Sequence, residues 1–97
     1  MNLVEFIKKT DTLFINIATV RIDLSMHGSR TTLEMGIEET PDYFGQNKSI
    51  SKKFIAIIDL DKRFGLVESN FENVPEQIRT AVFETVIEFV STPTNKR

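Results

Sequence analysis

The feature that most constrains this chain is the nearly unbroken apolar run at residues 54–60, Phe-Ile-Ala-Ile-Ile-Asp-Leu. A short run of this kind, bounded by polar residues, is typical of a strand covered on both faces. It falls far short of the ~20 apolar residues that a membrane span needs. The run therefore predicts a central strand, and the rest of the chain must supply its neighbours and its cover.

Three further segments predict those neighbouring strands. Residues 13–24 alternate apolar and polar side chains, but the parity switches in the middle, which favours a strand with a β-bulge. The alternative is a preceding helix that runs further into this segment. Residues 33–37 alternate with one polar face, and residues 64–69 return from a turn to form a hairpin with the central strand.

Two segments predict helices. Residues 2–9 carry apolar side chains at helical spacing and form a short amphipathic helix. The second helix runs from about 74 to 90, with Asn73 as its cap and Pro75 in its first turn. Pro93 ends it, and residues 93–97 are expected to be a frayed tail.

The order of these elements predicts an α+β fold. It consists of a short N-terminal helix, a four-stranded antiparallel meander and a long C-terminal helix packed on one face of the sheet. The sequence contains no repeat, low-complexity tract or linker, so residues 1–97 are expected to form a single domain.

Composition excludes several classes of protein. The chain has no cysteine, which rules out disulfide scaffolds and thiolate metal sites, and its single histidine rules out multi-histidine metal centres. The formal net charge of −2 argues against a strongly basic nucleic-acid binder. Because no signal segment and no membrane span are recognisable, we expect a cytoplasmic protein without a cofactor.

Two features have a catalytic interpretation that the pattern does not favour. Asp59 and Asp61 form an Asp-x-Asp pair, but no third acidic ligand accompanies them, and aspartates at hairpin ends serve turn geometry. His27 lies beside Gly28 in a predicted turn, without an orienting acid or an activated nucleophile in its motif. We therefore predict that the protein is not an enzyme.

The last predicted helix carries apolar side chains on two sides. One stripe is sufficient to face a sheet, yet Phe83 and Ile87 lie one turn apart on nearly the opposite side. Either the N-terminal helix covers them, or they form an interface with a second copy or another protein.

The central strand raises the same question. If Phe54, Ala56 and Ile58 face the helix, Ile55 and Ile57 point to the other face of the sheet, to which Phe14 of the first predicted strand would add. An apolar second face predicts sheet-to-sheet packing in a homodimer. The alternative is that one or two of these residues are simply exposed, as in an ordinary monomer.

The long connection between the second and third strands has a third interpretation. It contains aromatic and basic residues that together could contact single-stranded nucleic acid: Tyr43, Phe44, Lys48, Lys52 and Lys53. We expect Lys62 and Arg63 to lie near them at a strand end. The alternative is that the aromatic residues close the edge of the core and the lysines keep the loop soluble.

The last quarter of the chain carries a family resemblance. Residues 74–78 (Val-Pro-Glu-Gln-Ile) and 88–93 (Glu-Phe-Val-Ser-Thr-Pro), with Lys96 and Arg97 at the end, resemble the C-terminal helix of small phage and prophage proteins of Gram-positive bacteria. The resemblance covers about 20 residues and implies a bacterial cytoplasm and an accessory role in infection. Together with the two-sided apolar elements, it predicts a non-enzymatic protein-interaction module, homodimeric or bound to another protein.

Overall fold

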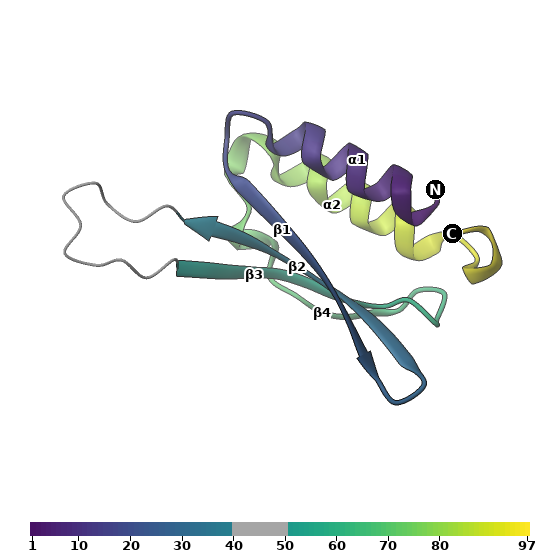
Figure 1. The fold of residues 1–97 in the computed structure, drawn as a ribbon. Coiled ribbons are helices and arrows are strands. Elements are labelled where there is room, and N and C mark those ends of the chain that lie inside the picture. Colours follow the sequence, from purple (N-terminus) through teal and green to yellow (C-terminus); the bar gives the residue numbers. More distant parts are fainter. Residues whose placement is uncertain (40–50) are drawn as a thin grey trace.

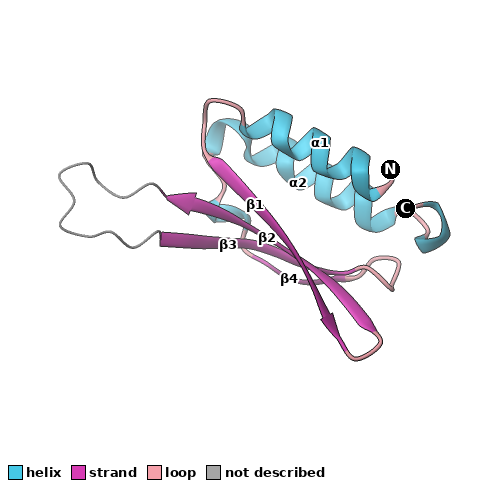
Figure 2. Ribbon diagram, viewed as in Figure 1, coloured by secondary structure: helices cyan, strands magenta, loops and turns pink. Residues whose placement is uncertain are grey.

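The computed structural model confirms the α+β fold and describes residues 1–39 and 51–97 (Figures 1 and 2). Its elements, in chain order, are α1 (Leu3–Phe14), β1 (Thr19–His27), β2 (Arg30–Glu39), β3 (Ser51–Asp59), β4 (Leu66–Ser69), the 3-10 turn η1 (Phe71–Asn73), α2 (Glu76–Ser91) and the 3-10 turn η2 (Thr94–Lys96). The strands form one antiparallel sheet in the order β1-β2-β3-β4.

Both helices lie on the same face of the sheet (Figure 1). They run antiparallel, so the N-terminal end of α1 meets the C-terminal end of α2. Phe6 stacks on Phe89 with ring centroids 4.4 Å apart, and the terminal amine of Met1 donates to Thr92 Oγ1 at 3.1 Å. Between the helices and the sheet lies a single core, whose members are almost fully buried: Phe6, Phe14, Leu33, Met35, Ile37, Ile55, Ala56, Ile58, Val74, Val82, Val86, Phe89 and Val90.

Helix α1 is longer than the sequence pattern indicates. Asn2 and Glu5 form a capping box at its start, each side chain accepting from the other's backbone N–H. The helix buries Phe6, Thr10 and Phe14 at four-residue spacing. The expectation of a strand over residues 13–24 is therefore wrong for its first half, because the helix continues to Phe14 and β1 begins only at Thr19, and the alternative of a longer helix is correct.

A β-bulge decides which residues of β3 enter the core. Met35 pairs with Ala56 but the next residue, Gly36, pairs with Phe54, so Ile55 is an extra residue on β3. Ile55 and Ala56 are both fully buried. The prediction that Ile55 lies on the outer face is wrong, because alternation by parity fails across a bulge.

The start of α2 also differs from its prediction. The cap position is Pro75, which makes no side-chain capping bond. Asn73 instead donates its amide Nδ2 to Phe54 O at 2.6 Å, which ties η1 to the neighbouring strand β3.

The C-terminal residues do not form a frayed tail. The Arg97 guanidinium donates to the carbonyl oxygens of Leu60 (3.0 Å), Val90 (2.9 Å) and Thr92 (3.1 Å) and lies over the Phe89 ring. The bonds to Val90 O and Thr92 O lie at the C-terminal end of α2, the negative end of the helix dipole. Burial lowers the pKa of Arg97, and the charge of Asp59 acts against that shift.

Candidate interaction surfaces

The two aspartates after β3 build a turn. Asp59 is 3% exposed, and its Oδ1 accepts the N–H of Asp61 at 2.9 Å. Asp61 Oδ2 accepts the N–H of Thr31 at 2.8 Å, and Arg30 lies 3.5 Å from Asp59 Oδ2. Among the residues that the structure describes, no three acidic or imidazole groups lie close enough to hold a metal ion. The pair therefore joins the β3–β4 turn to β2.

The single histidine lies at the tip of the β1–β2 hairpin. His27 is exposed and pairs in register with Arg30, across a turn in which Gly28 adopts a φ of 66°. This is the left-handed conformation that glycine allows in a tight turn.

One flank of α2 is left uncovered. Phe83 is 45% and Ile87 36% exposed, because α1 packs on the Phe89 side of the helix. Phe71 of η1 meets Phe83 edge to face, with centroids 5.1 Å apart. Phe64, 64% exposed, lies at the other end of this flank, where its N–H donates to Val90 O at 2.7 Å. These four side chains, Phe64, Phe71, Phe83 and Ile87, are called the α2 flank below.

Acidic side chains surround the α2 flank. Glu72 and Glu76 lie at the start of α2, and Glu84 lies beside Phe83; all three are exposed. Glu88 is also exposed and pairs with Lys9 of α1 at 3.4 Å. The flank therefore combines an apolar centre with a largely acidic rim.

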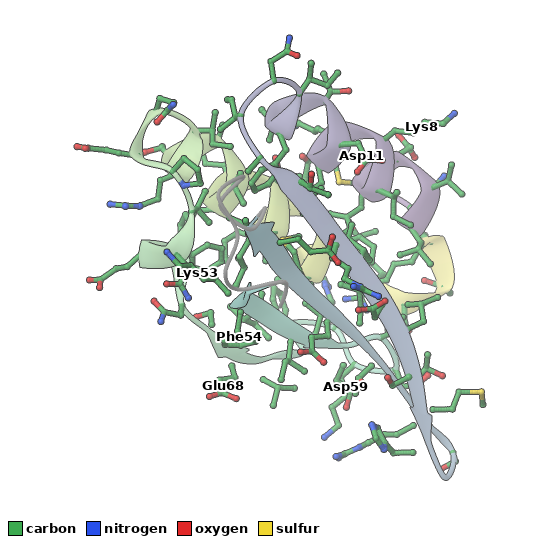
Figure 3. All side chains as sticks on the ribbon, turned by 60° about the vertical axis from the view of Figure 1, so that its left-hand side comes forward. Lys8, Asp11, Lys53, Phe54, Asp59 and Glu68 are labelled. Carbon is green, nitrogen blue, oxygen red and sulfur yellow. The ribbon has the colours of Figure 1, made fainter. Side chains whose placement is uncertain are left out.

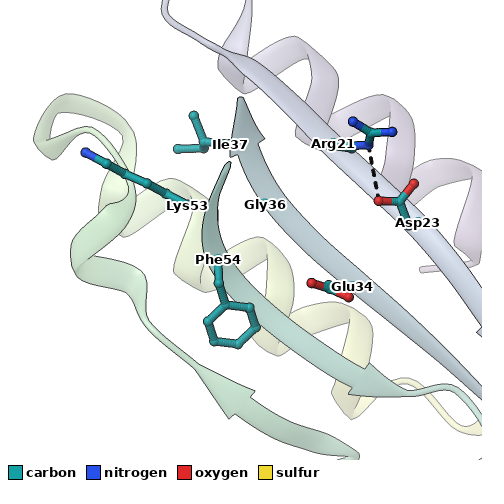
Figure 4. Close-up of a pocket in the computed structure, with 7 residues that line it drawn as sticks. All are labelled: Arg21, Asp23, Glu34, Gly36, Ile37, Lys53 and Phe54. Atoms are coloured by element: carbon teal, nitrogen blue, oxygen red, sulfur yellow. Dashed lines mark ion pairs between the residues drawn. The ribbon is translucent and has the colours of Figure 1, made fainter. Parts of the chain in front are cut away.

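The sheet face turned away from the helices is mixed in character. Phe54 and Ile57 are half-buried on it, but they lie beside charged side chains of all four strands, including Arg21, Glu34 and Glu68. A hollow of about 190 Å³ opens on this face, lined by Arg21, Asp23, Glu34, Gly36, Ile37, Lys53 and Phe54 (Figure 4).

Two residues predicted for an apolar outer face of the sheet are absent from it. Ile55 is fully buried under the helices, and Phe14 is 2% exposed within α1. Neither can contribute to an interface of the folded chain. Only Ile57 of the three predicted sheet residues lies on that face, so the basis for sheet-to-sheet packing is lost.

Strand β1 forms one edge of the sheet and presents apolar side chains that sequence reasoning did not select. Leu24 is 55% and Met26 74% exposed, at the part of the β1–β2 hairpin that extends beyond the helices (Figure 1). Among the described residues β1 pairs with β2 alone. The edge position of this strand was predictable, because the first strand of a meander has one neighbour, but the exposure of Leu24 and Met26 was not.

Charged residues on the outer face of β1 form ion pairs within the chain. Arg21 lies 3.3 Å from Asp23 (Figure 4) and also forms an ion pair with Glu38 of β2. The hydrogen bond to Glu38, together with the charges of Asp23 and Glu38, raises the pKa of Arg21 above its ordinary value.

Only some of the predicted nucleic-acid contacts lie among the residues that the structure describes. Tyr43, Phe44 and Lys48 lie outside the described residues, as does the side chain of Lys52. Lys53 is exposed near the start of β3, whereas Lys62 and Arg63 follow its far end, about 20 Å away along the strand. Figure 3 shows Lys53 and Asp59 at the two ends of this strand.

The expectation that Lys62 and Arg63 lie near the loop is therefore wrong. Arg63 has a different role, since its Nε donates to Ser91 O at 2.7 Å at the end of α2. A larger hollow of about 650 Å³ lies near Lys53, between the start of β1 and η1. One of the polar side chains that line this hollow is already hydrogen-bonded within the chain, because Arg79 donates to Val74 O and Glu72 O.

Comparisons with known proteins give no family for this chain. No family model matches it, and neither curated proteins nor solved structures include a match. Neither of the described helices has the length and apolar character needed to cross a bilayer.

Proposed function

We propose that this chain is a non-enzymatic protein-interaction module that works as a homo-oligomer, with the dimer as its basic unit. The observation that carries the proposal is the number of large apolar side chains left exposed after sheet and helices have packed. Two groups of them lie on the α2 flank and on the β1 edge, and others lie on α1 and the turn that follows it and on β4.

The energetics favour burial of these surfaces. Fully burying a side chain such as Phe, Leu or Ile contributes ~1.5–3 kcal/mol. Phe64, Phe83, Leu24 and Met26 are each at least 45% exposed, so each retains much of that contribution for an intermolecular contact. Grouped apolar exposure of this kind marks an interaction surface more often than does a single exposed residue.

The cellular context of the proposal rests on the C-terminal resemblance. Similarity of residues 74–93 to small phage and prophage proteins of Gram-positive bacteria supports an accessory role in a bacterial cytoplasm. The genes that flank this one test the point, since an accessory phage protein is expected to lie among other phage genes.

Sedimentation equilibrium tests self-association directly. We expect the average mass of the wild-type chain to approach that of a dimer as the concentration rises through the micromolar range. A mass that stays at the monomer value at every concentration would contradict the proposal, whichever surface is considered.

A further inference from the structure

We infer that the β1 edge is the surface that binds a second copy of this chain, by antiparallel pairing of β1 with β1 of the partner. This inference rests on the proposed homo-oligomer and specifies its contact. The two four-stranded sheets would then continue into one another, with all helices on the same face.

Strand β1 lacks three of the features that protect an edge, namely a short length, a proline and a bulge, although it carries the charged side chains of Arg21 and Asp23. It has nine residues, contains no proline, and pairs with β2 over its whole length without a register shift. The outer row of its N–H and C=O groups has no strand beside it among the described residues. A long, regular edge with exposed apolar side chains is a template for strand addition.

The two faces of the sheet restrict the register. Val20, Ile22, Leu24 and Met26 share the helix side, since they pair with Ile37, Met35, Leu33 and Thr31 of β2. Side chains directly opposite each other in a ladder share a face. A joined sheet that keeps its apolar sides together must therefore place these residues opposite one another, and a slip by one residue would invert the partner.

Charge favours the register that pairs Arg21 with Asp23. If the two-fold axis passes through Ile22, Arg21 lies opposite the partner's Asp23, and Asp23 lies opposite the partner's Arg21. On the helix side, Val20 then lies opposite the partner's Leu24 and covers it. Moving the axis to Arg21 or to Asp23 would instead place like charges against each other, which is unfavourable.

The same register relieves an unfavourable pair within the monomer. Asp23 lies directly opposite Glu34 in the β1–β2 ladder, and both carboxylates are exposed. Arg21 compensates only in part, because it also binds Glu38. The partner's Arg21 would bring a second cation to the free side of Asp23, giving a row of alternating charge across the axis.

Helix α1 is also self-complementary on the side away from α2. Val4, Lys8 and Asp11 follow one stripe at helical spacing, and Ile15 lies just past the end of the helix; Val4 and Ile15 are 59% and 61% exposed. Figure 3 shows Lys8 and Asp11 on the outer side of this helix. In an antiparallel contact with a second α1, Val4 would meet the partner's Ile15 and Lys8 the partner's Asp11. Helix α1 contacts β1, so it would approach the partner in a sheet that is joined at β1.

The α2 flank does not offer this self-complementarity. Its rim carries three exposed glutamates, Glu72, Glu76 and Glu84, against the cations Arg63 and Arg79, so a symmetric contact between two copies would bring net acidic rims together. Charge therefore favours the β1 edge over the α2 flank for a second copy.

A matched pair of lysine substitutions tests the inference. Leu24→Lys places a cation opposite the partner's Val20, whereas Val67→Lys makes the same change on β4, the other edge strand, at a residue of similar exposure (63% against 55%). We expect Leu24→Lys to raise the dissociation constant of the dimer about a hundredfold. Val67→Lys should leave it within about twofold of wild type.

The outcomes separate this inference from the proposed function. Circular dichroism of both variants checks that they fold, which is expected because both side chains are more than half exposed. A Leu24→Lys protein that dimerises like wild type overturns the β1 contact. If Phe83→Glu dissociates the dimer instead, the α2 flank is the interface and the homo-oligomer stands. A wild-type chain that is monomeric at every concentration would contradict both the β1 contact and the proposed homo-oligomer.

Discussion

The two edges of the sheet are built differently. β1 has nine residues in continuous register with its neighbour, whereas β4 has four and its pairing shifts between Ile57 and Ile58. Short strands and bulges are the means by which natural sheets discourage edge-to-edge pairing. By strand length and regularity, the β4 edge is protected against pairing with a further strand and the β1 edge is not.

Hydrogen bonds from residues just outside the paired parts of β3 and β4 also hold the β4 side of the sheet. Asn70 N–H donates to Ile55 O at 2.7 Å, and Asp59 N–H donates to Gly65 O at 2.7 Å. Arg97 reaches Leu60 O just beyond β3. We therefore expect substitutions on the β4 side to lower the free energy of unfolding. Substitutions on β1 should instead weaken association and leave folding intact.

Gly65→Ala is the strongest way to disturb the β4 side. A Cβ at this position would lie 2.4 Å from Asp59 O and 2.9 Å from Lys62 O, both backbone atoms that cannot turn aside. The turn before β4 would have to move, and we expect a loss of about 2–3 kcal/mol in the free energy of unfolding. Urea denaturation monitored by circular dichroism measures it.

Gly28→Asn is the matched control at the β1–β2 turn. Gly28 also has a special backbone, with φ of 66°, but a Cβ there would have no neighbour within 4 Å. Asparagine tolerates this conformation, so the loss should stay below about 1 kcal/mol. Equal losses for the two variants would refute the distinction between the two turns.

Arg97→Ala removes the contacts that the Arg97 guanidinium makes with the end of β3 and the end of α2. Three hydrogen bonds from a charged donor and the contact with the Phe89 ring disappear together. Partial exposure moderates the effect, and we expect about 2 kcal/mol of destabilisation. Thermal unfolding compares it with Lys96→Ala, an exposed neighbour that should change stability by less than about 0.5 kcal/mol.

Charge reversal on β1 is expected to have a smaller effect, mainly on association, since the exposed ion pairs that Arg21 makes within the chain contribute little to folding. Arg21→Asp would put two pairs of aspartates across the dimer axis, and Asp23→Arg would put two pairs of arginines there. Each variant alone should dimerise about tenfold more weakly. An equimolar mixture of the two should recover the loss, because the aspartates of one variant would then face the arginines of the other.

Native mass spectrometry of that mixture distinguishes the registers. Heterodimers should outnumber both homodimers well beyond the statistical ratio. A statistical distribution would show that residues 21 and 23 do not face each other across the contact.

The sequence pattern predicts the order of elements well, because each strand and α2 buries a face with its own regular period. It fails where local structure departs from that period. Thr10 is polar yet buried in α1, which hides the stripe that links Phe6 to Phe14. The bulge at Ile55 is set by the pairing of β2 with β3, and no periodicity within β3 alone reveals it.

The candidate surfaces were predictable to a lesser degree. Phe83 and Ile87 were found because helical spacing places them opposite the buried stripe, and they are indeed exposed. Leu24 and Met26 were missed, since their alternation resembles that of a half-buried strand. Their exposure depends on where the helices end above the sheet, which is a tertiary property.

Residue-resolved hydrogen exchange of wild type and Leu24→Lys tests the central claim most directly. In a monomer, the amides of β1 that point away from β2 exchange with solvent, whereas pairing with a second β1 protects them. We predict that wild type at high concentration gains protection at alternate amides of β1 and that Leu24→Lys does not, with β4 unchanged in both. Protection gained along α2 or β4 while β1 stays the same would contradict the account.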